Sequence, residues 1–113
     1  MSTSGTCALV NNNHDLIEIL RATNRVIALF HASWCPFCVT FLPIFKKHAE
    51  GEGRQFVSVQ DDQETIADHY SVKVYPTVLF FEDGVVSKRL DGISGVGLDE
   101  KQLVEFINSW PLS

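Results

Sequence analysis

The sequence predicts an α/β fold in which helices flank a central mixed β-sheet, in the order α-β-α-β-α-β-β-α. Three observations indicate this class. Short apolar runs alternate with longer segments whose apolar residues recur at helical spacing. Asp83-Gly84 is a hairpin turn signal between the last two strand-like runs, so these two should pair antiparallel. Helices separate the earlier strands, which should therefore pair in parallel. The 113 residues suit a single domain over 1–113.

The first half of the chain is expected to contain two helices around one buried strand. Asparagine side chains at 11–13 can cap a helix over His14 to Thr23. The nearly continuous apolar run Val26 to Phe30 is typical of a strand buried on both faces. Pro36 suits the first turn of a second helix, which should run to about Ala49 with Pro43 kinking it.

The second half is expected to contain the remaining strands and two further helices. Each segment follows from β-branched and aromatic enrichment or from helical spacing. The predicted segments are a strand over Phe56 to Val59, a short helix over Gln63 to His69, strands over Thr77 to Glu82 and Val85 to Leu90, and a helix over Leu98 to Trp110.

Composition and charge limit the partners that the chain can have. The net charge is −5 and the nine basic residues are scattered, which argues against a nucleic-acid partner. No stretch approaches the roughly 18 apolar residues of a membrane span, and no signal-peptide pattern opens the chain. We therefore expect a cytoplasmic monomer, in a compartment where a close cysteine pair is more often catalytic or metal-binding than structural.

Cys35 and Cys38 are the candidate catalytic residues. They follow a buried strand and open a helix, where unpaired backbone N–H groups and the helix dipole favour a thiolate at Cys35. Cys38, one turn further on, can attack a mixed disulfide held at Cys35, which is the resolving role in thiol–disulfide exchange. A structural zinc site needs four ligands, and the four histidines show no paired ligand spacing. No metal is expected, although zinc binding or a purely structural pair remains an alternative.

Further local features stand at the spacing of one known family. They are the strand Val26 to Phe30, the run Ala32-Ser33-Trp34-Cys35-Pro36-Phe37-Cys38, Pro43, the run Val74-Tyr75-Pro76-Thr77, and the run Phe80-Phe81-Glu82-Asp83-Gly84 followed by Gly92. With these features the sequence resembles the thioredoxin family over about Asn13 to Trp110. The resemblance implies the thioredoxin fold.

The resemblance also implies a substrate-binding surface beside the cysteines. It implies that Tyr75-Pro76 is a cis peptide bond that faces them, and that this loop with Thr77 presents backbone groups to an extended substrate. Trp34 would shield the rim of the site, and Gly92 would help to complete an apolar docking surface. Without the motif, a half-buried core aromatic would describe Trp34 equally well.

The sequence departs from the family pattern at two places. Thioredoxins usually carry Gly-Pro between the cysteines, whereas Pro36-Phe37 resembles the dipeptide of glutaredoxins. We expect this to raise the reduction potential to roughly −200 to −250 mV, above that of thioredoxin. The buried aspartate and lysine that thioredoxins use near the deeper cysteine align with Leu29 and Ser58. Cys38 should consequently be hard to ionise, because apolar burial raises a thiol pKa.

Two further residues have an open role. His31 precedes Cys35 by four residues and titrates near neutrality, so it is a candidate proton shuttle; a packing substitute for the family's aromatic residue is the alternative. Cys7 lies outside the motif and is most simply a spectator, with a regulatory or intermolecular disulfide as the other possibility.

The resemblance implies a protein-disulfide oxidoreductase in which Cys35 attacks and Cys38 resolves. Its substrates would be protein disulfides, and its electrons would come from an NADPH-dependent flavoprotein reductase or from glutathione. No dinucleotide fingerprint occurs, so the chain itself needs no cofactor. The alternatives are a glutaredoxin-like, disulfide-oxidising or isomerase activity, and a redox-inactive module that only binds at the Pro76 surface.

Overall fold

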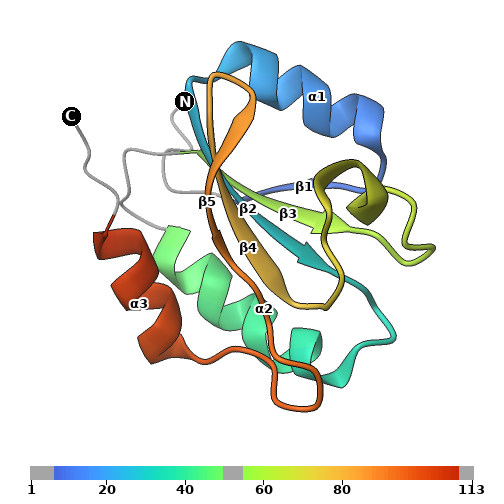
Figure 1. Cartoon of the computed structure of the whole chain (residues 1–113), viewed down its shortest axis with the longest axis vertical. Helices are drawn as coiled ribbons and strands as arrows, with labels where there is room; N and C mark the ends of the chain where they lie inside the picture. Colours follow the sequence, from blue (N-terminus) through green and yellow to red (C-terminus); the bar gives the residue numbers. More distant parts are fainter. Residues whose placement is uncertain (1–6, 50–54, 110–113) are drawn as a thin grey trace.

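The computed structural model describes residues 7–49 and 55–109. Its five-stranded sheet has the order β1-β3-β2-β4-β5 (Figure 1). The strands are β1 (Cys7–Val10), β2 (Arg25–His31), β3 (Gln55–Gln60), β4 (Thr77–Glu82) and β5 (Val85–Leu90). The helices are α1 (Asn13–Ala22), α2 (Pro36–Ala49), the short 3-10 helix η1 (Ala67–Tyr70) and α3 (Glu100–Asn108).

Strand β2 lies at the centre of the sheet. It pairs in parallel with β3 and antiparallel with β4, and β5 pairs antiparallel with β4 across the Asp83-Gly84 turn. From Val26 to His31 every residue of β2 is buried, which is why the sequence from Val26 to Phe30 is an uninterrupted apolar run. The expected mixed sheet is therefore present, with parallel early strands and a final hairpin.

Side chains of β2 alternate between two apolar layers, one on each face of the sheet. Val26, Ala28 and Phe30 belong to the layer that also contains residues of α1 and η1. Ile27 and Leu29 belong to the layer formed with α2 and α3. Figure 1 shows the same arrangement, with α1 on one side of the sheet and α2 and α3 on the other.

Two elements differ from the expectation. β1 precedes α1 and pairs in parallel with β3, so the observed order begins with a strand that the sequence prediction lacked. The helix expected over Gln63 to His69 is only the single turn η1 over Ala67–Tyr70, because the left-handed backbone at Glu64, with φ 60°, interrupts a helix that would start at Gln63. The expected end of the last helix at Trp110 lies outside the described residues.

The register of β2 and β4 brings distant segments to one edge of the sheet. Phe30 pairs with Thr77, so Pro76 lies at the edge where β2 ends and the chain turns into α2. Asp61 follows β3 at the same edge and donates its N–H to the His31 carbonyl at 2.8 Å. No helix in the described part of the chain is long and apolar enough to cross a membrane.

Candidate functional site

Cys35 lies immediately before α2 and Cys38 lies in its first turn, and both are buried. The Cys38 N–H donates to Cys35 Sγ at 3.3 Å, and Cys35 Sγ lies 3.6 Å from the Tyr75 carbonyl oxygen. A backbone N–H directed at a sulfur favours negative charge on it. The first turn of α2 therefore directs the Cys38 backbone N–H at the Cys35 sulfur.

Cys38 is the harder of these groups to ionise. Burial raises its pKa to about 12, and the adjacent Cys35 sulfur acts in the same direction, while a backbone hydrogen bond from Ala32 opposes the rise. The sequence prediction for this thiol agrees with this result. Leu29 is fully buried in the α2 layer and pairs in register with Ser58, so the two residues that replace the family's aspartate and lysine are neighbours in the sheet.

The Tyr75–Pro76 peptide bond is cis, as the resemblance implied. The loop that contains it is fixed by Thr77, whose hydroxyl donates to the Val74 carbonyl at 2.6 Å and accepts the Gly92 N–H at 3.2 Å. Gly92 lies so close that a Cβ there would overlap the Pro76 carbonyl oxygen. A glycine is thus required at 92 for the two loops to pack.

Trp34 stands at the rim of the site. Its side chain is 56% exposed, its Nε1 donates to the Asp62 carbonyl at 2.8 Å, and its ring centroid lies 5.8 Å from that of Tyr75. The Asp62 carboxylate accepts the N–H and the hydroxyl of Ser33, each at 2.7 Å. Two hydrogen-bonded turns therefore hold Trp34 in place while most of its ring faces solvent.

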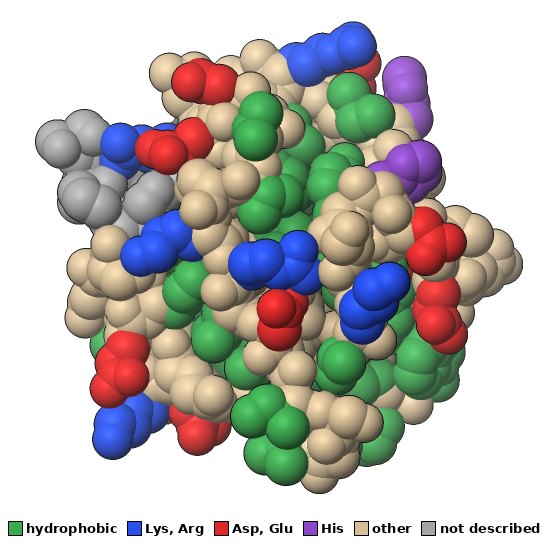
Figure 2. All heavy atoms as spheres, in the orientation of Figure 1, with side chains coloured by type: hydrophobic (Ala, Val, Ile, Leu, Met, Phe, Trp, Pro, Cys, Tyr) green, Lys and Arg blue, Asp and Glu red, His purple; other side chains and the backbone are tan. Residues whose placement is uncertain are grey.

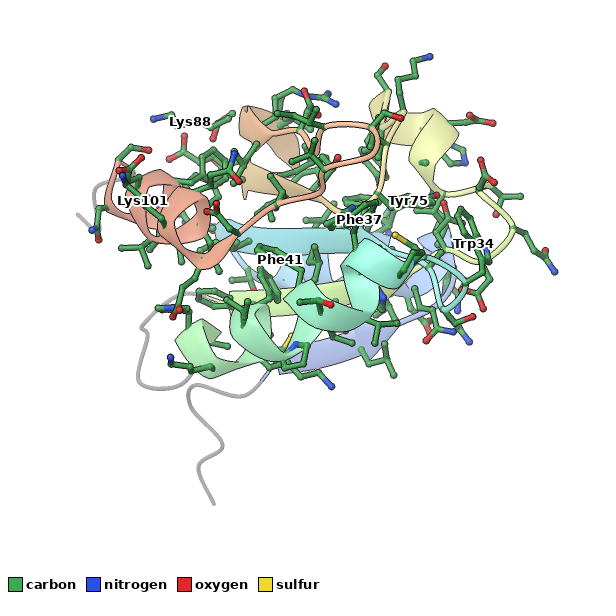
Figure 3. The ribbon with its side chains drawn as sticks, turned by 90° about the horizontal axis from the view of Figure 1, so that it is seen from below. Trp34, Phe37, Phe41, Tyr75, Lys88 and Lys101 are labelled. Atoms are coloured by element: carbon green, nitrogen blue, oxygen red, sulfur yellow. The ribbon has the colours of Figure 1, made fainter. Side chains whose placement is uncertain are left out.

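Apolar side chains are exposed around the cysteines. Phe37 lies against Gly97, where a Cβ would come within 2.9 Å of the Phe37 Cβ, and Ile93 and Val96 are exposed on the same loop. Figure 2 shows hydrophobic side chains gathered at the bottom of the view, where this loop and the start of α2 lie in Figure 1. Figure 3 shows Trp34, Phe37 and Tyr75 at the same end of the molecule.

A buried carboxylate, Asp61, supports the site and was not found from the sequence. It accepts N–H groups from Thr65, Ile66 and Ala67 at 2.8–3.0 Å and the Tyr75 hydroxyl at 2.7 Å. Burial acts to raise the Asp61 pKa, but these hydrogen bonds outweigh it and hold the pKa below its usual value. The sequence indicates this contact only weakly, through a polar residue directly after β3 and a tyrosine before Pro76.

His31 ends β2 and is 4% exposed. Its Nε2 is buried and has no hydrogen-bond partner among residues 7–49 and 55–109. Cys7 lies on β1, away from the motif; burial raises its pKa, and a Ser58 hydrogen bond opposes the rise. Within the described ranges, no group of three or more His, Cys, Asp or Glu side chains could hold a metal ion.

The comparisons with known proteins agree with this geometry. The thioredoxin family model matches residues 6–110. The chain belongs to the thioredoxin family. A thioredoxin from Mycoplasma genitalium is 36% identical over 96 residues, covering 83% of this chain and 90% of the relative. A thioredoxin from Mycoplasmoides gallisepticum is 33% identical over 85 residues, covering 74% and 85%.

Solved thioredoxins share the fold. The structure from Schistosoma mansoni superposes with a TM-score of 0.81 at 24% identity and covers 97% of this chain and all of that one (100%). The structure from Fasciola hepatica has a TM-score of 0.78 at 27% identity, covering 90% and 97%. The α/β thioredoxin fold expected from the sequence is confirmed. Proteins of this family are typically protein-disulfide oxidoreductases that act with a reductase, and this chain carries the Cys-x-x-Cys pair of such a centre.

Proposed function

We propose that this thioredoxin-family protein reduces protein disulfides, with Cys35 as the attacking nucleophile and Cys38 as the resolving thiol. The observation that carries the proposal is the hydrogen bond from the Cys38 N–H to Cys35 Sγ, beside the cis-Pro76 loop. Cys35 attacks one sulfur of the substrate disulfide, and the other sulfur leaves as a thiolate. Cys38 then attacks Cys35 Sγ, which releases the second substrate sulfur and leaves a Cys35–Cys38 disulfide.

The surface around Cys35 supports a protein substrate. A groove of about 230 Å³ has apolar and charged side chains in its walls, among them Trp34, Tyr75, Asp68 and Lys73, and it includes Cys35. Its aromatic side chains and the cis-Pro76 loop offer an extended segment both packing area and backbone groups. In this proposal Trp34, Pro36, Phe37 and His31 support the site, and Tyr75, Pro76, Thr77 and Gly92 contribute to binding.

A disulfide-reduction assay tests the proposal. The reduced protein should reduce insulin, and turnover should continue with NADPH and a thioredoxin reductase. Cys35→Ser should abolish the activity, and Cys38→Ser should accumulate a mixed disulfide detectable by mass spectrometry. Cys7→Ser is the matched control and should keep full activity. Folded, reduced protein that leaves insulin intact would contradict the proposal and favour a module that only binds.

The Pro36-Phe37 dipeptide supports a second candidate, a glutaredoxin-like or disulfide-oxidising role. Phe37 stands between the two cysteines and packs on Gly97, so the immediate surroundings of the cysteines differ from those of a Gly-Pro motif. A redox titration of the Cys35/Cys38 couple separates the two. We expect roughly −200 to −250 mV, and a value at or below about −270 mV would assign an ordinary thioredoxin potential. Faster turnover with glutathione than with the reductase would favour the second candidate.

Several expectations stay predictions. Glutathione or a flavoprotein reductase remains the proposed electron source, and the cytoplasmic setting and the monomeric state remain proposed as well. The chain itself is proposed to work without a bound cofactor.

A further inference from the structure

Resolution requires Cys38 to lose its proton, and the described residues put no carboxylate on the buried face below it. Leu29 occupies the position where the family places its aspartate. Burial holds the Cys38 pKa far above neutrality, so at neutral pH the thiol needs a nearby base. Such a base must lie among the side chains that surround Cys38.

His31 lies on the same side of the sheet as Cys38. Side chains alternate along a strand, so His31 follows Ile27 and Leu29 onto the face covered by α2. Ala32, the next residue, forms a backbone hydrogen bond with the Cys38 sulfur. The end of β2 is therefore in direct contact with the first turn of α2.

His31 and Cys38 also line one pocket of about 200 Å³, with Ser33, Val39, Leu42 and Gln60 among its other walls. Its volume is several times the roughly 30 Å³ that one water occupies in the liquid. Ser33 and Val39 are exposed, so the pocket reaches the surface. It offers the polar partners that a bound water needs, namely the imidazole, the thiol and the Gln60 amide.

The ring of His31 has an acceptor available. Nε2 is buried and unpartnered among the described residues, although a buried polar atom normally has a hydrogen-bond partner. In the neutral ring one nitrogen holds a proton and the other carries a free lone pair, so the imidazole can accept a proton in either tautomer. The unpartnered ring nitrogen and the shared pocket are two independent observations on one residue.

We propose that His31 is the proton acceptor for Cys38 during resolution, through water in the pocket that the two residues share. The Cys38 proton passes through this water to the His31 imidazole as Cys38 Sγ attacks Cys35 Sγ. The bond between Cys35 and the substrate sulfur breaks, and that sulfur leaves as a thiolate and takes a proton from solvent. The imidazolium returns its proton to solvent through the open side of the pocket. The two cysteines are oxidised to a disulfide and the substrate is reduced.

The charges around His31 are compatible with this role. Burial lowers its pKa below the usual value, the Asp62 carboxylate beyond β3 raises it, and Lys46 on α2 lowers it. The net effect is a ring that is neutral at pH 7 and can accept a proton. This inference rests on the proposed function, since it concerns the second step of that reaction.

A single-turnover experiment separates the two steps. Reduced protein is mixed with a peptide disulfide that fluoresces on cleavage, and formation of the mixed disulfide is followed by its resolution. His31→Phe and His31→Gln should slow resolution about 100-fold at pH 7, the lower end of the range for general-base catalysis. Formation, measured alone in the Cys38→Ser background, should keep its rate. His14→Phe, at an exposed histidine on α1, is the matched control.

The pH profile gives a readout that a purely structural role would not change. Resolution in the unaltered chain should level off above the pKa of His31, whereas in both variants it should keep rising toward the pKa of Cys38. Resolution with the original rate and profile in the variants would overturn the inference, and so would equal slowing of both steps. If no mixed disulfide forms with Cys38→Ser, the proposed function itself fails.

A measurement on the unaltered protein makes the test independent of variant folding. The ring signals of His31 in NMR should titrate with a midpoint below the usual value of 6.5. This midpoint should move when Cys35 and Cys38 are oxidised, because the Cys38 thiol proton is then gone. A His31 midpoint that is the same in both redox states would contradict the inference.

Discussion

At the scale of single residues, the site differs from its family in the residues that lie near the Cys38 thiol. Leu29 and Ser58 face each other in the register of β2 and β3, where the family has a charged pair. An apolar residue avoids the cost of burying a carboxylate, but it leaves Cys38 without that group as a base. His31, two residues along the same face, has an unpartnered ring nitrogen among the described residues, and in the proposal above its imidazole takes the place of that base.

Gly92 is the residue whose substitution should be most disruptive. A methyl group at 92 overlaps the Pro76 carbonyl, so Gly92→Ala must displace either the cis-Pro76 loop or the loop before α3. We expect a loss of about 1–3 kcal/mol in unfolding free energy, as for overpacking. The rate of insulin reduction should also fall, and by more than the loss of folded protein alone would cause, because the displaced loop faces Cys35.

The control for this substitution is Gly95→Ala. Its Cβ would meet nothing within 4 Å, although φ is +79° and some backbone strain is expected. Urea unfolding and insulin turnover measured on both variants give the comparison. An unchanged rate of insulin reduction in the Gly92→Ala variant would contradict this expectation. It would mean that the contact between Gly92 and Pro76 does not help to position the substrate.

At the scale of elements, η1 and the cis-Pro76 loop are joined through one carboxylate. Asp61 caps the segment that leads into η1 and also accepts the Tyr75 hydroxyl. Asp61→Asn keeps the size of the side chain but replaces one acceptor oxygen with an NH₂ donor. Unfolding free energy should fall by about 2–4 kcal/mol, because hydrogen bonds to a charged group are lost in a buried place.

The variant Tyr75→Phe separates the two functions of this carboxylate. It removes only the hydroxyl that reaches Asp61 and should cost about 1–2 kcal/mol, less than Asp61→Asn. Chemical denaturation of the two variants at pH 7 provides both values. Equal losses would mean that the N–H groups of 65–67 contribute little to the stability of this segment.

Helix α3 has a capping box that can be tested separately from the site. The Asp99 carboxylate accepts the Gln102 N–H at 2.9 Å, and the Gln102 side chain accepts the Asp99 N–H at 3.0 Å. Asp99→Ala should lower the unfolding free energy by about 1 kcal/mol and leave the disulfide-reduction rate unchanged. Lys101→Ala, at an exposed position of the same helix, should change neither. A rate that falls with Asp99→Ala would show that α3 influences the site.

The elements also explain which parts of the fold the sequence could predict. β2, α2 and the hairpin carry their signals in contiguous residues, through an apolar run, a proline at N1 and Asp83-Gly84. β1 is only four residues long, and it is a strand because it pairs with β3, almost fifty residues later in the chain. The Asp61–Tyr75 contact is equally non-local, since it joins two side chains fourteen positions apart in sequence.

At the scale of the whole molecule, a sheet with two covered faces brings the site together at one edge. The cysteines come from α2, the cis-Pro76 loop from the start of β4, and Asp61 from the end of β3. The motif residues could be named from sequence because the family match lies in short runs. Their mutual geometry could not, because it depends on the β2–β4 register and on buried polar contacts such as those of Asp61.

The stability of the whole molecule should fall in two steps as the pH is lowered. His31 has a folded-state pKa below 6.5, so the unfolded chain binds that proton first, and stability is lost as the pH falls below 6.5 toward the folded value. Asp61 has a folded-state pKa below 3.8, so its contribution is present above 3.8 and is lost as the pH falls further. Urea midpoints measured from pH 8 to pH 3 should resolve both losses. His31→Phe should remove only the upper loss. An upper step that persists unchanged in His31→Phe would assign that proton to another group.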